Sequence, residues 1–327
     1  MMNQLKLGVL FLMIVFCSCC IAQNKGESTS YGPTTSVRII KQDRNGNIWL
    51  ASNEGIIRYD GKSFTNITGE VGSNRFFSVL EDSKGNFWFG NNGTGAYYYD
   101  SVKKSLQHFT TEDGLISNQV MCMYEDRIGT VWFGTRGGVS SYNPRRSLGQ
   151  PFQNLTTEGG FSNNGVTTII EDKTGRIWFG TRDNTYTYDG KKTTVFTSKD
   201  NKTFSDVWSI IEDKKGNIWL GGGDGLWRYD GNTCTNFTHD FVNYVYEDKK
   251  GNIWTSGNNA NGIWALCCYD TKSSANQKPM VIEIPQSLNL FGILEASDGS
   301  IWFGSFDGVY RYDSKQAVGN TITGFKK

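Results

Sequence analysis

The chain has 327 residues, with 33 lysines and arginines against 32 aspartates and glutamates, so its formal net charge is +1. A length of 327 residues taken alone suggests about two domains. The balanced charge and the lack of a basic block argue against a nucleic-acid partner, because nucleic-acid binding relies on clustered positive charge.

The first 22 residues have the pattern of an export signal. An apolar run at 7–16 is too short to span a bilayer as a helix and is typical of a signal-peptide core. The segment FCSC at 16–19 is loosely similar to a bacterial lipobox, so we expect a lipoprotein signal that ends at residue 18 and a lipid on Cys19. Ordinary cleavage after Ala22 is the alternative. We therefore expect an exported protein, in the outer membrane or periplasm as a lipoprotein, and otherwise periplasmic or secreted.

Residues 23–35 are expected to form a linker, and from residue 36 onward one motif recurs along the chain. A clear copy is EDKTGRIWFGT at 171–181, in which an aspartate and a glycine stand six and three residues before the tryptophan. The glycine is present in every copy and the aspartate in all but the last, which has Ala296 instead. Such repetition indicates a repeat architecture. The motif tryptophans are Trp49, Trp88, Trp132, Trp178, Trp219, Trp254 and Trp302.

Each copy predicts four short strands. Around the copy just quoted, runs rich in β-branched and aromatic residues at 166–172, 177–181, 185–188 and 193–196 are separated by turn residues. The first two strands carry apolar residues on both faces and are expected to be buried on both sides. Four strands every ~40–45 residues are typical of propeller blades. We therefore predict an all-β fold, a seven-bladed β-propeller of four-stranded antiparallel blades, over residues 36–327.

The repeated residues have structural explanations. In the copy at 171–181, Asp172 can accept hydrogen bonds from the amides of the turn, and Gly175 can adopt a positive φ. Trp178 can fill the space between adjacent blades. A calcium loop is the functional alternative, but the motif has too few carboxylates for one. We expect these tryptophans to be structural, with no metal and no cofactor.

A second conserved position within the repeats lies seven residues before each tryptophan. These side chains could bind a cation as a ring of carboxylates, but their presence in nearly every blade favours hydrogen bonds between neighbouring blades. They are Gln42, Glu81, Glu125, Glu171, Glu212, Glu247 and Glu295.

Four cysteines remain after the signal, at Cys122, Cys234, Cys267 and Cys268. An exported chain permits disulfides, and the three possible pairings stay open. A buried free thiol is the simpler expectation for Cys122, on an innermost strand. The spacing of the four does not match a zinc site.

The candidate ligand site is on the face of the disc that carries the connections between the second and third strands and between blades. These connections vary from blade to blade, whereas the turns on the opposite face repeat, and variable loops on a constant scaffold usually carry specificity. The first strands begin at this face, eleven residues before each motif tryptophan. These starting residues are Arg38, Phe77, Met121, Thr167, Trp208, Asn243 and Phe291.

Amides, charges and aromatic rings around one channel mouth would suit a polar ligand such as a glycan. Arg136 and Arg182 occupy the same loop position in consecutive blades, and Trp208 could provide a stacking wall beside them. The alternative is that each arginine pairs with a local acid, or that these are ordinary solvated loop residues. The predicted ligand-binding residues are Arg136, Arg182, Asp183, Trp208, Asn118, Asn164, Asp206 and Asp224.

Signals of catalysis are weak. His108 and His239 are the only histidines, and both fall on or beside outer strands of the predicted blades. The chain has no nucleophile elbow, phosphate loop or metal triad. We therefore predict no catalytic residues.

The repeats resemble the two-component regulator propeller repeat, most clearly at 120–142, 166–188 and 207–229. The resemblance implies the ligand-sensing propeller of bacterial hybrid histidine kinases, often a carbohydrate sensor, here as a stand-alone exported propeller without a kinase. It implies a small polar ligand or glycan and a membrane signalling protein as partners. A protein–protein interaction scaffold is one alternative. A propeller lyase or hydrolase is another, but streptogramin-lyase-like sites use a histidine beside the channel.

Overall fold

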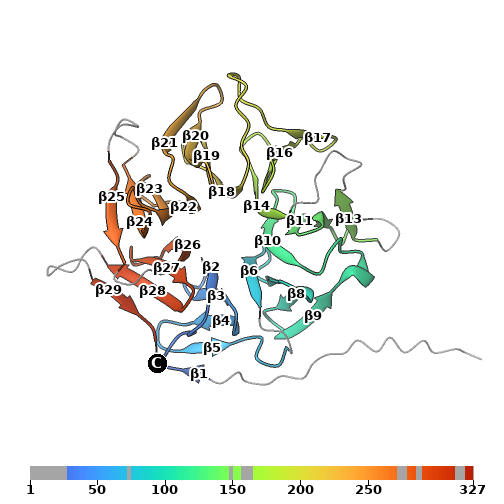
Figure 1. Ribbon diagram of the computed structural model, residues 1–327. Coiled ribbons are helices and arrows are strands. Elements are labelled where there is room, and N and C mark those ends of the chain that lie inside the picture. The colour runs from blue at the N-terminus through green and yellow to red at the C-terminus, as the bar shows by residue number, and fades with distance from the viewer. Residues whose placement is uncertain are drawn as a thin grey trace, which may run out of the picture.

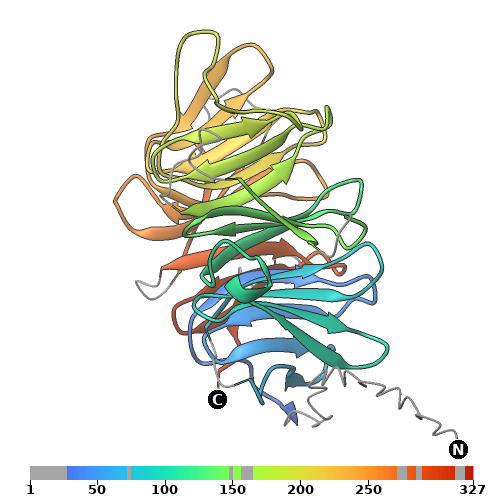
Figure 2. The same cartoon turned by 90° about the vertical axis from the view of Figure 1, so that its right-hand side faces the viewer.

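The computed structural model of the chain describes residues 28–71, 75–146, 150–155, 165–270, 278–284, 289–313 and 321–326. Seven antiparallel sheets surround a central axis, as Figure 1 shows along that axis and Figure 2 from the edge. The predicted seven-bladed all-β propeller of four-stranded antiparallel blades is therefore confirmed. The expected export signal at 1–22 and lipid site at Cys19 lie outside the described residues.

Each blade is one continuous stretch of chain whose four strands follow one another outward from the centre (Figure 1). Blade 1 consists of β2 (Val37–Gln42), β3 (Ile48–Ser52), β4 (Gly55–Tyr59) and β5 (Phe64–Asn66), and blade 2 of β6 (Phe76–Glu81), β7 (Phe87–Asn91), β8 (Gly95–Asp100) and β9 (Ser105–Phe109). Blade 3 consists of β10 (Val120–Glu125), β11 (Val131–Thr135), β12 (Gly138–Tyr142) and β13 (Phe152–Leu155), and blade 4 of β14 (Val166–Glu171), β15 (Ile177–Thr181), β16 (Thr185–Tyr188) and β17 (Thr193–Val195). Blades 5 to 7 consist of β18 (Val207–Glu212), β19 (Ile218–Gly222), β20 (Gly225–Tyr229) and β21 (Cys234–Thr238); β22 (Val242–Glu247), β23 (Ile253–Asn258), β24 (Trp264–Tyr269) and β25 (Met280–Glu283); and β26 (Leu290–Glu295), β27 (Ile301–Ser305), β28 (Gly308–Asp313) and β29 (Thr321–Gly324). Among the described residues the helical element is the short 3-10 helix η1 (Thr111–Asp113), and none of their helices is long and apolar enough to cross a membrane.

Burial differs between the two inner strands of a blade. In blade 4, β15 is buried at all five positions, whereas β14 is buried at only two of its six positions. The innermost strand is more open because one of its faces lines the central cavity. The expectation of burial on both faces is therefore right for the second strand and wrong for the first strand of blades 1 to 6, whereas β26 of blade 7 is buried at five of its six positions.

Part of the expected linker at 23–35 is structured. The strand β1 (Ser28–Thr29) pairs antiparallel with β5 and gives the first sheet a fifth strand. Farther along, the N–H of Gly32 donates to the carbonyl of Phe325 at 2.7 Å. A side chain at Gly32 would lie 3.2 Å from the ring of Phe64, so the glycine allows the close approach. The segment thus joins blade 1 to the end of blade 7, a long-range pairing that a short polar sequence does not signal.

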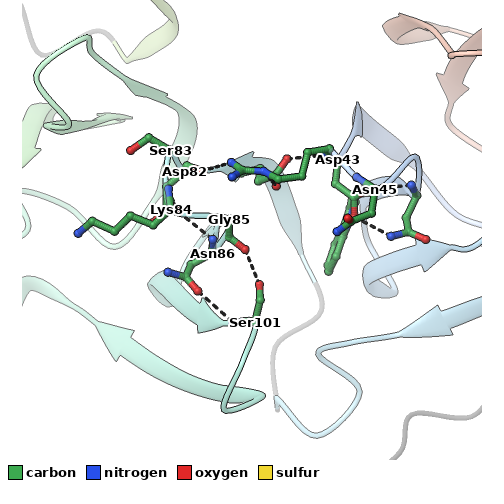
Figure 3. Close-up of polar contacts among 12 residues, drawn as sticks. Asp43, Asn45, Asp82, Ser83, Lys84, Gly85, Asn86 and Ser101 are labelled. Atoms are coloured by element: carbon green, nitrogen blue, oxygen red, sulfur yellow. Dashed lines mark hydrogen bonds and ion pairs between the residues drawn. The ribbon is translucent and has the colours of Figure 1, made fainter.

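The repeated aspartate and glycine build the turn between the first two strands. In blade 4, one oxygen of Asp172 accepts the amides of Thr174 and Arg176 at 2.9 and 3.1 Å, and Gly175 has a φ of 84°. Figure 3 shows the equivalent turn of blade 2 around Asp82. Burial alone would raise the pKa of Asp172, but hydrogen bonds from Thr174, Trp178 and the turn amides outweigh it and lower that pKa.

The second oxygen of the turn aspartate binds the motif tryptophan. Trp178 Nε1 donates to Asp172 Oδ2 at 2.8 Å, and blades 1, 3, 5 and 6 repeat this bond at 2.8–2.9 Å. Blade 7 has Ala296 in place of the aspartate, and its indole donates to Ser300 Oγ instead. In blade 2 the buried Nε1 of Trp88 has no partner among the described residues.

The motif tryptophans fill the spaces between blades, as predicted. Each is at most 7% exposed. Trp178 packs against Val207, Ile210 and Leu220 of the next blade. At the closure of the ring, Trp302 of blade 7 packs against blade 1 and stacks on Phe325, with ring centroids 4.8 Å apart. The repeat therefore places one large aromatic side chain in each gap.

The ring of acidic side chains also joins neighbouring blades, which supports the structural alternative over a cation site. In six blades, a glutamate oxygen accepts the backbone N–H of a turn in the preceding blade at 2.6–3.1 Å. Gln42 closes the circle by donating to Ser297 Oγ at 3.2 Å. Basic side chains add further hydrogen bonds between neighbouring blades; for example, Arg44 Nη2 donates to the carbonyl of Asp82 at 2.7 Å. No group of residues in the described part of the chain has the arrangement of a metal site.

The four cysteines are free thiols in the described structure. Burial raises the pKa of the Cys122 thiol to about 12, so the thiol is protonated and inert at neutral pH. The free thiol expected for Cys122 is confirmed.

Candidate functional site

An irregularity at the start of each innermost strand shapes the mouth of the central channel. The pairing of β14 with β15 skips Thr167, and the same shift occurs at the equivalent position of every blade. A β-bulge of this kind turns a side chain out of the regular alternation and is common beside binding sites. The bulge positions line a central cavity of about 270 Å³, and we call their side chains the bulge ring: Arg38, Phe77, Met121, Thr167, Trp208, Asn243 and Phe291.

The members of the bulge ring differ in whether their side chains form hydrogen bonds to the backbone. Thr167 Oγ1 donates to the carbonyl of Gly180 at 3.0 Å, and Asn243 Nδ2 donates to the carbonyl of Leu290 at 2.8 Å. These two side chains hold backbone in place. The aromatic and charged members have no such bond to the described backbone, which leaves their side chains available for contacts across the mouth.

Three of the predicted site residues come together at blades 4 and 5. The guanidinium carbon of Arg182 lies 5.1 Å from the ring centroid of Trp208, and Trp208 Nε1 donates to Asp206 Oδ1 at 3.0 Å. The N–H of Asp206 donates to the carbonyl of Arg182 at 2.8 Å. Asp206 has a φ of 50°, a left-handed conformation that is unfavourable for a residue with a side chain. This backbone conformation aims the carboxylate at the indole and fixes its orientation.

The second predicted arginine lies on the same face. The N–H of Arg136 donates to the carbonyl of Gln119, just before the first strand of the same blade, whereas the carbonyl of Arg182 accepts from Asp206, just before the first strand of the next blade. Both arginines are exposed, and neither forms an ion pair with a described residue. The alternative in which a local acid neutralises each arginine therefore has no support in the described residues.

Other predicted site residues form hydrogen bonds within their own loops or lie elsewhere. Asn118 Oδ1 accepts the N–H of Thr111 at 2.9 Å, and Asp183 Oδ1 accepts the hydroxyl of Thr181 at 2.5 Å. Asp224 is exposed at a loop tip, and its carbonyl accepts the indole N–H of Trp227. Asn164 lies outside the described residues. The contacts of Asn118 and Asp183 are those of loop supports.

Sequence reasoning placed Arg38 in the ring but not among the ligand-binding residues. Its guanidinium carbon lies 4.9 Å from the ring centroid of Phe77 and 4.3 Å from that of Phe291. The sequence did contain a signal for this cluster. Because the propeller closes into a ring, the strand-start residue of blade 1, Arg38, lies between those of blades 7 and 2, which are Phe291 and Phe77.

The two histidines lie away from the cavity, as predicted. His108 is on the outermost strand β9 and stacks on Tyr97 with ring centroids 4.2 Å apart. His239 follows the outermost strand β21 and contacts the edge of Trp227. Neither histidine lines the central cavity.

Comparison with known families identifies the repeats. Five segments match the family model described as two component regulator propeller: residues 31–54, 70–93, 114–137, 160–183 and 202–224. The chain is a two-component regulator propeller repeat protein. Each matched segment runs from the connection before a blade to the end of its second strand. Blades 6 and 7 of this propeller lie beyond those segments but have the same four strands.

Solved structures show the same fold at low identity. Virginiamycin B lyase from Staphylococcus aureus is 14% identical over 87% of this chain and 98% of that chain, with a TM-score of 0.68. The WD40 propeller domain of Doa1 is 16% identical over 90% and 97%, with a TM-score of 0.63. The extracellular domain of a putative hybrid two component system from B. thetaiotaomicron is 17% identical over 89% and 52%, with a TM-score of 0.49. No curated protein sequence matches the chain.

Proposed function

We propose that this two-component regulator propeller is a non-catalytic, exported ligand-binding module that binds a carbohydrate or similar polar molecule at the mouth formed by the bulge ring. Its ligand-bound state is read by a membrane signalling protein. The family description supports the signalling context, and the chemistry of the mouth supports binding. The expected lipid anchor at Cys19 would hold the propeller at the membrane beside such a partner.

The observation that carries this proposal is the unit of Arg182 and Trp208. The indole presents an aromatic surface for stacking against a sugar ring, and the guanidinium offers hydrogen-bond donors that no described acid occupies. Asp206 fixes the indole by its 3.0 Å hydrogen bond, so little side-chain freedom is lost on binding. A rigid aromatic platform beside an open donor is an arrangement suited to a hydroxyl-rich ligand.

The test is a screen of neutral and acidic oligosaccharides against the purified mature protein by thermal shift and calorimetry. For an oligosaccharide that binds, Arg182→Ala and Trp208→Ala should each weaken binding at least tenfold, about 1.4 kcal/mol. Lys202→Ala is the matched control, because Lys202 lies 4.0 Å from the ring centroid of Trp227, away from the central cavity. This control should bind as the wild type does.

Three results would contradict the proposal. Unchanged affinity in both Arg182→Ala and Trp208→Ala would show that the ligand binds elsewhere. Capture of a stable protein partner by a propeller that binds none of the sugars would favour the interaction scaffold. Turnover of a bound sugar would favour the lyase or hydrolase alternative.

A further inference from the structure

A second cationic group lies at the same channel mouth, at blade 1. Arg38 is the bulge residue of β2, and it has phenylalanines from two other blades around it. Its guanidinium carbon is 4.9 Å from the ring centroid of Phe77, 4.3 Å from Phe291 and 5.7 Å from Phe306. Phe291 and Phe306 pack edge to face with centroids 5.0 Å apart. Aromatic rings of blades 2 and 7 therefore flank one half-buried positive charge beside the cavity.

The guanidinium of Arg38 has no partner that balances its charge. Among the described residues it makes no ion pair and no hydrogen bond, and its Nε is buried without an acceptor. Burial, and to a lesser degree the charge of Arg75, lowers the pKa of Arg38 from its ordinary value. Arg38 is half-buried, and removing a cation from water even in part is unfavourable unless it is paired; contacts with aromatic faces offset only part of that cost.

Arginines on the opposite face of the disc show what structural arginines look like in this fold. Arg44 forms an ion pair with Glu81 and donates to the carbonyl of Asp82 at 2.7 Å. Arg127 donates to the carbonyl of Lys173 at 3.1 Å. Arg44 and Arg127 join neighbouring blades through these acceptors, whereas Arg38 has aromatic neighbours and no acceptor among the described residues. Arg228 resembles Arg38 in having, beside aromatic rings, a buried Nε without an acceptor among the described residues, so the feature that distinguishes Arg38 is its place on the central cavity.

The surroundings of Arg38 define the ligand chemistry that would fit. A guanidinium presents a fork of N–H donors that matches a carboxylate, and charge-assisted bonds of this kind are the stronger hydrogen bonds of proteins. The phenylalanine rings favour a flat or apolar ring face next to that carboxylate. Arg75 brings a second positive charge near the same place. An anion there would relieve the repulsion between the two arginines.

We propose that Arg38, framed by Phe77 and Phe291, forms an anion subsite of the channel mouth that binds a carboxylate carried on a ring. This inference adds detail to the proposed function and rests on it in one respect, because both place the ligand at the same channel mouth. It assigns the ligand an acidic group on the blade 1 side, roughly across the ring from Trp208 in blade 5 (Figure 1). A uronic acid and an aryl carboxylate share the required chemistry.

The experiment is a nuclear magnetic resonance titration of the ¹⁵N-labelled mature protein, following the arginine Nε–H signals. The Arg38 signal is assigned by its loss in Arg38→Met. The probes are galacturonate with galactose as its neutral match, and benzoate with benzyl alcohol as its neutral match. We expect the Arg38 signal to shift with galacturonate or benzoate and to stay in place with galactose and benzyl alcohol. Which of the two acids binds more tightly tells whether the subsite prefers a sugar ring or an aromatic ring.

A calorimetric titration completes the test. Arg38→Met should weaken binding of the responding carboxylate at least tenfold without lowering the melting temperature, because it removes a half-buried charge that has no partner among the described residues and keeps the bulk of the side chain. If that variant fails to fold, Arg38→Lys, which keeps the charge and lacks the fork, takes its place and should also weaken binding.

Three outcomes would overturn the subsite. The first is that neither acid shifts the Arg38 signal, and the second is that the neutral compounds shift it as much as the acids do. The third is that the Arg38 variants bind the carboxylate as tightly as the wild type. Arg182→Ala separates this inference from the proposed function. That variant should keep the Arg38 response to the acids even if no oligosaccharide binds at Trp208.

Discussion

The bond between the motif indole and the turn aspartate offers a test with an internal control. Blade 4 contains the bond from Trp178 to Asp172, whereas in blade 2 the indole of Trp88 has no partner among the described residues, although Asp82 is present. Replacing each tryptophan by phenylalanine removes the same atoms from two equivalent sites. The comparison isolates the hydrogen bond.

The expected difference follows from what the two sites share. Trp178 is 1% exposed and Trp88 is 3% exposed, so the loss of packing should be similar in both and should largely cancel. Trp178→Phe additionally removes a donor from the ionised Asp172, and hydrogen bonds to charged groups contribute ~1.5–3 kcal/mol. Trp88→Phe instead removes a buried donor without a partner. We therefore expect Trp178→Phe to lower the free energy of unfolding by ~1.5–3 kcal/mol more than Trp88→Phe does.

The assay is equilibrium unfolding in urea, followed by far-ultraviolet circular dichroism, with the slope of the transition compared among the three proteins. Equal losses in the two variants would refute the argument, because they would mean that the indole bond adds nothing beyond packing. A larger loss for Trp88→Phe would refute it as well.

Three further predictions concern the turns and the N-terminus. Gly175→Ala should destabilise the fold by ~1–2 kcal/mol, measured by urea unfolding, because a side chain there would be strained at a φ of 84° although space is available; no measurable loss would contradict this. The folded-state pKa values of Asp172, Asp213 and Asp248 are lowered, so their contribution to stability should be present above about pH 4 and lost as the pH falls through those values, with Glu247, whose pKa burial raises, acting in the opposite sense. A urea midpoint that stays constant from pH 7 to pH 3, or an unchanged pH dependence in Asp172→Asn, would refute this. Cys19→Ala should move the protein out of the membrane fraction, and mass spectrometry of a mature wild-type protein that starts unlipidated at Gln23 would contradict the lipid anchor.

The candidate site was only partly accessible from sequence. Loop position alone brought Arg182 and Trp208 together correctly, because the loop after the second strand of one blade lies beside the start of the first strand of the next blade. The same reasoning did not show that Asn118 and Asp183 bond within their own loops, since those contacts depend on where each loop turns back. Arg38 was missed as a ligand residue because its aromatic neighbours come from blades 2 and 7, at opposite ends of the chain.

The sequence by itself determined the number of blades, the turn chemistry and the role of the motif tryptophans. Those features depend on contacts within a few residues, and each is repeated, so that spacing alone reveals it. Only the tertiary structure decided the bulge at the start of every innermost strand, the partners of the carboxylates between blades, whose bonding role the repeats had already indicated, and the joining of the segment around Gly32 to Phe325. These features depend on how seven sheets close into one ring, which brings together residues from distant parts of the chain and leaves the guanidinium of Arg38 without an acceptor among the described residues.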